Sequence, residues 1–147
     1  PVVLQHAIMP ILQKKNRGLV INIASINAYV AIPGNQVYTA TKAFMMSFSL
    51  AVEGENDTSD IVFQLVLPGT TITPFHEKQG VQPAAGTMYP DKVAKGSLRN
   101  LNKSIYIPNR YDRIIPFITS VFSKRQALRI ARHQIKRRLG LNKQTSS

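Results

Sequence analysis

The chain has 147 residues, 44% of them hydrophobic, which suits one globular domain with a buried core and argues against a disordered protein. It contains no cysteine, which excludes disulfide frameworks and thiolate metal sites. No apolar run approaches the roughly 18 residues that a membrane-spanning helix needs. The net charge of +12 lies mostly in residues 113–147, which hold nine Lys/Arg and no acidic residue. We therefore divide the chain into a folded part, residues 1–112, and a basic extension, residues 113–147.

The first predicted element is a helix over residues 2–14, because its apolar residues recur at helical spacing. This stripe consists of Val3, Leu4, Ala7, Ile8, Ile11 and Leu12. Pro10 is expected to kink or shorten the helix. The following run GLVINIAS, residues 18–25, is apolar and rich in β-branched residues, which predicts a strand buried on both faces. Residues 26–37 contain Pro33-Gly34 and predict a loop.

A second helix is predicted from Tyr38 to Glu53, followed by a polar connection and a buried strand over residues 61–68. The expected buried side of this helix comprises Ala40, Ala43, Phe44, Phe48, Ala51 and Val52. Further on, the pattern predicts a long loop over residues 74–90, a short helix from Asp91 to about Leu101 and a strand over residues 104–108. Two strands joined through a helix form a parallel crossover, so the expected fold class is α/β, with a doubly wound parallel sheet.

Three polar features follow the predicted strands, where such sheets bind ligands. Ser25 ends the first strand, Tyr38 and Lys42 open the next helix one turn apart, and PGTTIT, residues 68–73, leaves the second strand. A phenol is a poor base at neutral pH, but a nearby ammonium favours its ionised form. A tyrosine in that setting can exchange a proton with an alcohol or carbonyl, while a serine hydroxyl holds the substrate oxygen. Such a reaction also needs a hydride carrier.

The segment INIASINAYVAIPGNQVYTATKAF resembles the signature of the short-chain dehydrogenase/reductase family. In that family a strand ends in Ser, here Ser25, a Pro follows in the loop, here Pro33, and Tyr-x-x-x-Lys opens the next helix. LPGTTIT, residues 67–73, is similar to the family's Pro-Gly-x-x-x-Thr segment. A bare Tyr-x-x-x-Lys is common by chance, whereas the ordered set is specific. The resemblance covers residues 1 to about 108 and implies a Rossmann-like fold.

The resemblance implies a role for each matching residue. Tyr38 would be the general acid/base, Lys42 would assist it and hold the ribose hydroxyls, and Ser25 would orient the substrate oxygen. The residues implied to border the cofactor are Pro68, Gly69, Ile72 and Thr73, with Thr73 and the Ile72 backbone holding it. The implied cofactor is NAD(P)(H), with NADP favoured over NAD. The alternative is that these residues have no catalytic role. Tyr38 and Lys42 would then belong to an ordinary helix with the lysine at its surface, and Ser25 would cap a loop.

The resemblance also implies an oxidoreductase that interconverts a secondary alcohol and a ketone. It is nearest to the ketoacyl/hydroxysteroid-type reductases, which suggests a hydrophobic small-molecule carbonyl substrate. Tyr29, Val30 and Ile32 are expected either to line the substrate pocket or simply to pack. Members of the family often form homo-oligomers through the two helices that correspond to residues 2–14 and 38–53. No metal is expected, because His6 and His133 lack a second ligand at suitable spacing.

One part of the family pattern is missing. The family's phosphate-binding glycine loop lies in an N-terminal half, and the eight glycines of this chain form no such cluster. We therefore expect the chain to be the C-terminal portion of a longer enzyme, and we expect this polypeptide alone to be inactive. The alternative is a non-catalytic or membrane-surface-binding fragment that keeps the second half of the fold.

The basic extension has its own pattern. Leu128, Ala131, Ile135 and Leu139 form an apolar stripe, surrounded by Arg and Lys residues, that predicts an amphipathic helix. Such a helix can lie on an anionic membrane, bind nucleic acid, or pack on its own protein. No aromatic residue accompanies the basic ones after Phe122, which disfavours a nucleic-acid partner. The expected location is cytoplasmic, with peripheral membrane contact through residues 113–140 as a further possibility.

Overall fold

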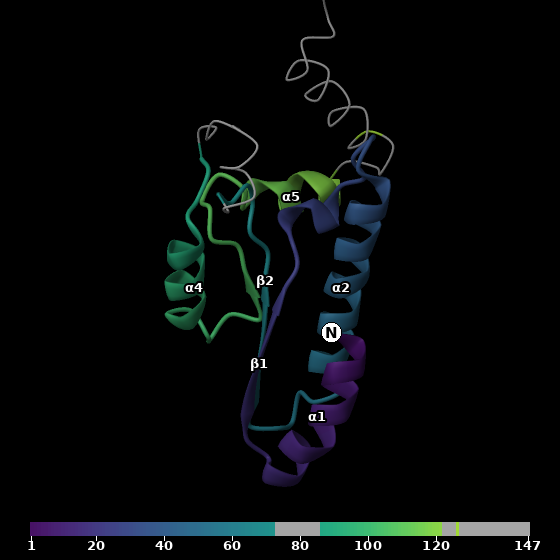
Figure 1. Ribbon diagram of the computed structural model, residues 1–147, viewed down its shortest axis with the longest axis vertical. Coiled ribbons are helices and arrows are strands. Elements are labelled where there is room, and N and C mark those ends of the chain that lie inside the picture. Colours follow the sequence, from purple (N-terminus) through teal and green to yellow (C-terminus); the bar gives the residue numbers. More distant parts are fainter. Residues whose placement is uncertain (73–85, 122–125, 127–147) are drawn as a thin grey trace, which may run out of the picture.

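The computed structural model describes residues 1–72, 86–121 and 126, and it contains a parallel three-stranded sheet between helices (Figure 1). The strands are β1 (Gly18–Ile23), β2 (Ile61–Val66) and β3 (Ile105–Tyr106), in the order β1-β2-β3. The helical elements are α1 (Val2–Lys15), the 3-10 helix η1 (Ile26–Tyr29), α2 (Gln36–Gly54), α4 (Pro90–Leu98) and α5 (Ile114–Val121). The predicted α/β class is therefore confirmed. The predicted helix of the basic extension lies outside the described residues.

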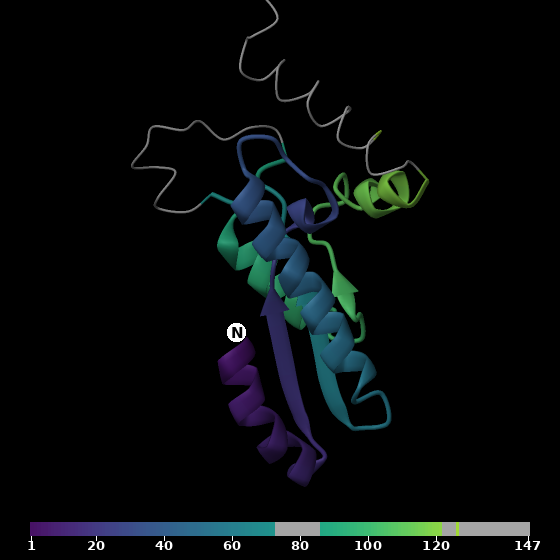
Figure 2. The ribbon, with the colours of Figure 1, turned by 90° about the vertical axis from the view of Figure 1, so that its right-hand side faces the viewer.

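Helices cover both faces of the sheet. Figure 1 shows α1 and α2 together on one side of the strands and α4 on the other, and in Figure 2, turned by 90°, α2 passes in front of the sheet. On the first side Met9 of α1 packs with Ile61 and Phe63 of β2. On the second side Val93 of α4 packs with Val66 and Tyr106. The crossover from β1 through α2 to β2 is the predicted parallel unit, with Gly18 opposite Ile61 and Ile23 opposite Val66.

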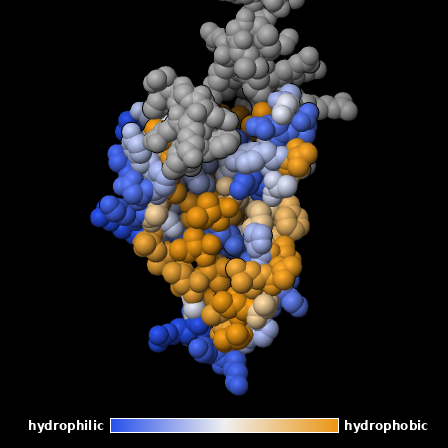
Figure 3. Space-filling view, viewed as in Figure 1, coloured by the Kyte–Doolittle hydropathy of each residue, from blue (hydrophilic) through white to orange (hydrophobic). Residues whose placement is uncertain are grey.

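The prediction that β1 is buried on both faces is wrong, whereas β2 is almost wholly buried. Leu19 and Ile23 are exposed, Ile23 by 62%. They alternate onto the same face as Ile21, which packs against the Val66–Val93–Tyr106 cluster beneath α4. The short α4 covers the middle of this face and leaves the ends of β1 open. Figure 3 shows the resulting apolar surface over the sheet and α1.

The apolar stripe predicted for the first helix does not face the sheet. Val3, Leu4, Ile8 and Ile11 are exposed, and the buried residues of α1 are Gln5 and Met9. The side-chain oxygen of buried Gln5 accepts a hydrogen bond from Asn22 Nδ2 of β1 at 3.2 Å, which satisfies one half of its amide group. Pro10 lies inside one continuous helix, so the helix is not shortened.

The second helix also turns a different side to the sheet from the one predicted. Ala40, Phe44 and Ala51 are exposed, while the other three members of the predicted set are partly buried. The buried residues are Thr39 and Ser49, whose hydroxyls donate to the carbonyls of Gln36 and Met45 at 3.1 and 2.7 Å. These internal bonds satisfy the hydroxyls, which then pack like small apolar groups. The helix begins at Gln36, two residues before Tyr38.

Candidate functional site

The carboxyl ends of β1 and β2 bring Ser25 and Pro68 together, as predicted. Beyond the strands the two segments stay hydrogen bonded: Ala24 N–H donates to Val66 O at 2.9 Å, and Ile26 N–H donates to Pro68 O at 3.0 Å. The turn into η1 and the Pro68-Gly69 corner therefore form one connected unit at this edge of the sheet. The start of α2 lies at the same end (Figure 1).

Ser25 is buried and extended, and its hydroxyl already has two partners. Oγ accepts a hydrogen bond from Asn27 N–H at 3.2 Å and donates to Pro68 O at 3.4 Å. The first bond makes Ser25 the N-cap of η1, in line with the capping role considered as the non-catalytic alternative for this residue. The second is long and hence weak. The hydroxyl proton can therefore turn to a stronger acceptor, such as a substrate oxygen, while the cap stays in place.

Tyr38 and Lys42 lie on one face of the first turns of α2, as their spacing predicted. Lys42 Nζ lies 5.5 Å from the centroid of the Tyr38 ring, within the range of a cation–π contact. Tyr38 is 41% exposed, so a ligand can reach it. In the part of the chain that the structure describes, the ion pair found is Lys95–Asp91, which leaves the Lys42 ammonium without a carboxylate partner there. Gly34, at φ 84°, forms the left-handed turn that leads into this helix.

The segment after Pro68 is held by a residue that sequence reasoning missed, Met88. Met88 N–H donates to Thr70 O at 3.0 Å, and Met88 O accepts from Ile72 N–H at 2.8 Å. The backbone N–H of Ile72, implied to hold the cofactor, is thus already bonded. No local pattern marks Met88, because its contribution is made entirely by the backbone. Thr73 lies outside the described residues.

Asp112 is a second residue that the sequence did not single out. A Cβ atom placed on Gly69 would lie 2.0 Å from Asp112 Oδ2, so the carboxylate fills the space beside this glycine. Burial raises the pKa of the Asp112 carboxyl. The space beside the glycine of the Pro-Gly corner is therefore occupied by a side chain from the segment that follows β3, and no short-range motif joins the two residues.

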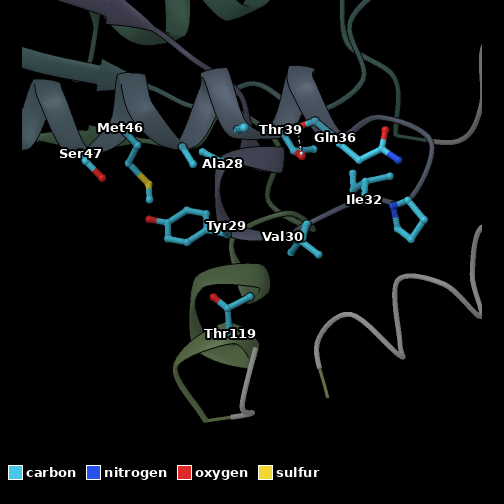
Figure 4. A pocket seen from close by; sticks show the side chains of 13 residues that line it. Ala28, Tyr29, Val30, Ile32, Gln36, Thr39, Met46, Ser47 and Thr119 are labelled. Atoms are coloured by element: carbon cyan, nitrogen blue, oxygen red, sulfur yellow. Dashed lines mark hydrogen bonds between the residues drawn. The ribbon is translucent and has the colours of Figure 1, made fainter. Parts of the chain in front are cut away.

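A cavity of about 780 Å³ lies between η1, α2 and α5 (Figure 4). Tyr29, Val30 and Ile32 line it, so the prediction that they border a pocket agrees with the geometry. Figure 4 shows the Tyr29 ring between Met46 and Ser47 of α2 and Thr119 of α5. The other lining residues are Ala28, Ala31, Pro33, Gln36, Thr39, Ala40 and Ala43. Burial raises the pKa of the Tyr29 phenol, which therefore stays protonated at neutral pH and can donate a hydrogen bond.

A family model for the short chain dehydrogenases matches residues 1–83, more than half of the chain. The chain belongs to this family. That match contains Ser25, Tyr38, Lys42 and the Pro68–Thr73 segment. The family consists of oxidoreductases, and the recognition made from the ordered motifs is confirmed.

Individual members of the family are similar over the same region. The 7beta-hydroxysteroid dehydrogenase of Mediterraneibacter gnavus is 35% identical over 107 residues, which is 67% of this chain and 40% of that protein. A solved 7beta-hydroxysteroid dehydrogenase matches with a TM-score of 0.73 at 21% identity, covering 86% of this chain and 50% of that one. A short-chain dehydrogenase of Sphingobium yanoikuyae, solved in complex with NADPH, has a TM-score of 0.65 at 25% identity and covers 80% and 50%. The chain thus spans half or less of these relatives, and they confirm its Rossmann-like fold.

Proposed function

We propose that this chain carries the catalytic residues of an NAD(P)-dependent oxidoreductase that interconverts a secondary alcohol and a ketone. The observation that carries the proposal is the meeting of three segments at one edge of the sheet. Ser25 Oγ lies 3.4 Å from the Pro68 carbonyl, and Tyr38 opens the neighbouring helix with Lys42 on the same face. Membership of the short-chain dehydrogenase family supports this assignment.

In the reductive direction, the Tyr38 hydroxyl gives its proton to the ketone oxygen as that oxygen gains charge. The Lys42 ammonium stabilises the phenolate that remains, and the phenolate recovers a proton from water. The Ser25 hydroxyl donates to the same substrate oxygen in place of the Pro68 carbonyl. The hydride would come from a nicotinamide cofactor held by these residues, so that one hydride and one proton would convert the ketone to the alcohol.

The residues present fit one end of a dinucleotide. The Tyr38 hydroxyl and Lys42 ammonium are donors on one exposed helix face, which suits the ribose hydroxyls next to the nicotinamide. Pro68, Gly69 and Ile72 would border the nicotinamide, and Ile72 N–H could contribute only by exchanging its bond to Met88. NADP is proposed over NAD, supported by the NADPH bound to the similar Sphingobium protein.

The substrate is proposed to be a hydrophobic ketone or the corresponding alcohol. The cavity between η1, α2 and α5 is lined chiefly by apolar side chains, with the Tyr29 phenol as a hydrogen-bond donor. The similarity to 7beta-hydroxysteroid dehydrogenases supports a bulky apolar substrate. We further propose that the exposed apolar sides of α1 and α2, with Leu4 and Phe44 at their centres, are a contact between subunits of a homo-oligomer.

The proposal is tested by Tyr38→Phe in the full-length enzyme. The change removes only the hydroxyl, and we expect turnover to fall at least about 100-fold because a proton-transfer group is lost. Tyr89→Phe is the matched control, since Tyr89 is an exposed tyrosine outside the site, and it should keep turnover unchanged. If Tyr38→Phe keeps near wild-type turnover, the mechanism is wrong. If no nicotinamide-dependent turnover of any ketone is found, the non-catalytic binding role is favoured.

A further inference from the structure

Helix α5 divides into two sides of different exposure. Ile114, Phe117 and Val121, at positions i, i+3 and i+7, lie on one side and are 57%, 68% and 62% exposed. Ile115, Ile118 and Thr119, which lie away from the centre of that side, are partly buried. Thr119 lines the cavity beside η1, and its hydroxyl donates within the helix to Ile115 O. This eight-residue, largely apolar helix thus borders the cavity through Thr119 and turns an apolar side outward.

The surroundings of this outward side are basic and aromatic. Tyr111, one turn before α5, is exposed, and the Arg110 guanidinium lies 4.7 Å from its ring centroid. Arg113 is exposed and donates from Nε to Ile107 O at 3.1 Å. The neighbouring acid, Asp112, points inward against Gly69 and opposes neither arginine at the surface. The sequence after α5 adds eight more Lys/Arg and no acid.

We propose that α5 is the membrane-contact element of this protein and places Ile114, Phe117 and Val121 in the interface of an anionic bilayer. Apolar side chains flanked by arginine and tyrosine are the groups that interfacial helices use, and the arginines can extend to lipid headgroups. No helix in residues 1–72 or 86–121 is long and apolar enough to cross a bilayer.

The sign of the charge decides between a bilayer and another apolar protein surface. Burying Phe117 alone would suit either partner, whereas nine Lys/Arg without a single acid in residues 113–147 favour a partner that is both apolar and anionic, as an acidic lipid surface is. An anionic lipid surface attracts each of these charges. The position of α5 over the cavity gives the contact a consequence, because a lipid-soluble ligand leaving the bilayer would meet the cavity wall at Thr119.

A fluorescence experiment tests the contact directly. The chain contains no tryptophan, so Phe117→Trp introduces a single reporter on the outward side of α5. We expect its emission to shift to shorter wavelength with phosphatidylcholine vesicles that contain about one-third phosphatidylserine, and to return in high salt. Phe44→Trp on α2, 56% exposed in the native chain, is the control and should not shift. No shift at residue 117, or equal shifts at both positions, would overturn the proposal.

Sedimentation with the same vesicles supplies a second measurement that needs no turnover. Phe117→Ser should weaken binding at least about fivefold, since an apolar ring no longer enters the interface. Leu98→Ser, at an exposed leucine of α4, should bind like the unsubstituted chain. The membrane proposal would be contradicted if both variants lost binding equally, or if the chain bound uncharged vesicles equally well. It would also be contradicted if the chain bound no vesicles and Phe117→Ser only dissociated an oligomer. Because the readout is lipid binding, a failure of the hydride-transfer proposal leaves this result unaffected.

Discussion

The carboxylate of Asp112 occupies the space that any side chain at residue 69 would need, with Oδ2 only 2.0 Å from the position of a Cβ atom. Gly69 does not have a positive φ, so a larger residue at this position is opposed by the contact with Asp112 and not by backbone strain. The Pro68-Gly69 corner is thereby fixed from two directions, by the hydrogen bonds to the Ser25–Ile26 turn and by the segment after β3.

Gly69→Ala is expected to destabilise the fold by about 1–3 kcal/mol, the usual scale for overpacking, because Asp112 must rotate away. Adding Asp112→Ala should recover part of this loss, since the obstructing atoms are then gone. Gly54→Ala is the matched control: nothing lies within 4 Å of its Cβ position at the end of α2, so no loss is expected. Urea unfolding of the four variants measures these differences. Equal free energies of unfolding for Gly69→Ala and Gly54→Ala would contradict the steric account.

Asp112→Asn tests the electrostatic side of the same contact. Burial raises the pKa of this carboxyl in the folded protein, so folding favours its protonated form. The contribution of this group to the stability of the fold is therefore complete below its ordinary pKa of about 4, and it is lost as the pH rises through the pKa of the folded state. The neutral amide avoids that loss. We expect the variant to unfold at a higher temperature than the native chain at neutral pH and at the same temperature at acidic pH. The gain is small because the carboxyl keeps part of its hydration, and a difference that grows on acidification would refute the sign.

Ala43→Leu adds volume to the cavity between η1, α2 and α5. If the cavity holds the apolar body of the substrate, KM for a hydrophobic ketone should rise about tenfold with little change in kcat, because binding is lost equally in the ground and transition states. Ala51→Leu, at an exposed alanine on the same helix, should leave both constants unchanged. Steady-state kinetics on the full-length enzyme measures both. Unchanged KM in Ala43→Leu would place the substrate elsewhere.

Leu4→Glu tests the proposed subunit contact through α1. Leu4 is 72% exposed here, and a charge buried in an apolar contact is costly. Light scattering after gel filtration should show a shift from oligomer to monomer for Leu4→Glu and none for Leu98→Glu on α4. An oligomer that survives the first change, or is lost in both, would remove α1 from the interface.

The sequence predicted the order of strands and helices and the meeting of Ser25 with Pro68, because both follow from apolar periodicity and from parallel strand ends. It failed on which helix sides are buried. Both sides of α2 carry apolar residues. The side that is buried contains Thr39 and Ser49, whose hydroxyls form hydrogen bonds within the helix and therefore tolerate burial. Hydropathy alone counts these residues as polar.

The same limit explains the missed site residues. Asp112 and Met88 contact the Pro68–Ile72 segment from distant positions in the sequence, Asp112 by filling space and Met88 through backbone hydrogen bonds. Neither kind of contact produces a residue spacing that can be recognised in the sequence. The burial of β1 was overestimated because an apolar run indicates that a strand avoids water but not which element covers it.

The order β1-β2-β3 also leaves the outer edge of β1 without a neighbouring strand among the described residues. Every second residue of β1 directs its backbone N–H and C=O away from β2, and this edge carries exposed Leu19 and Ile23 with neither proline nor charge along it. Such an edge can pair with any extended chain, including another molecule of the same polypeptide. Preparations of this chain should therefore form intermolecular sheet on concentration, and a lysine in place of Leu19 should keep it dispersed.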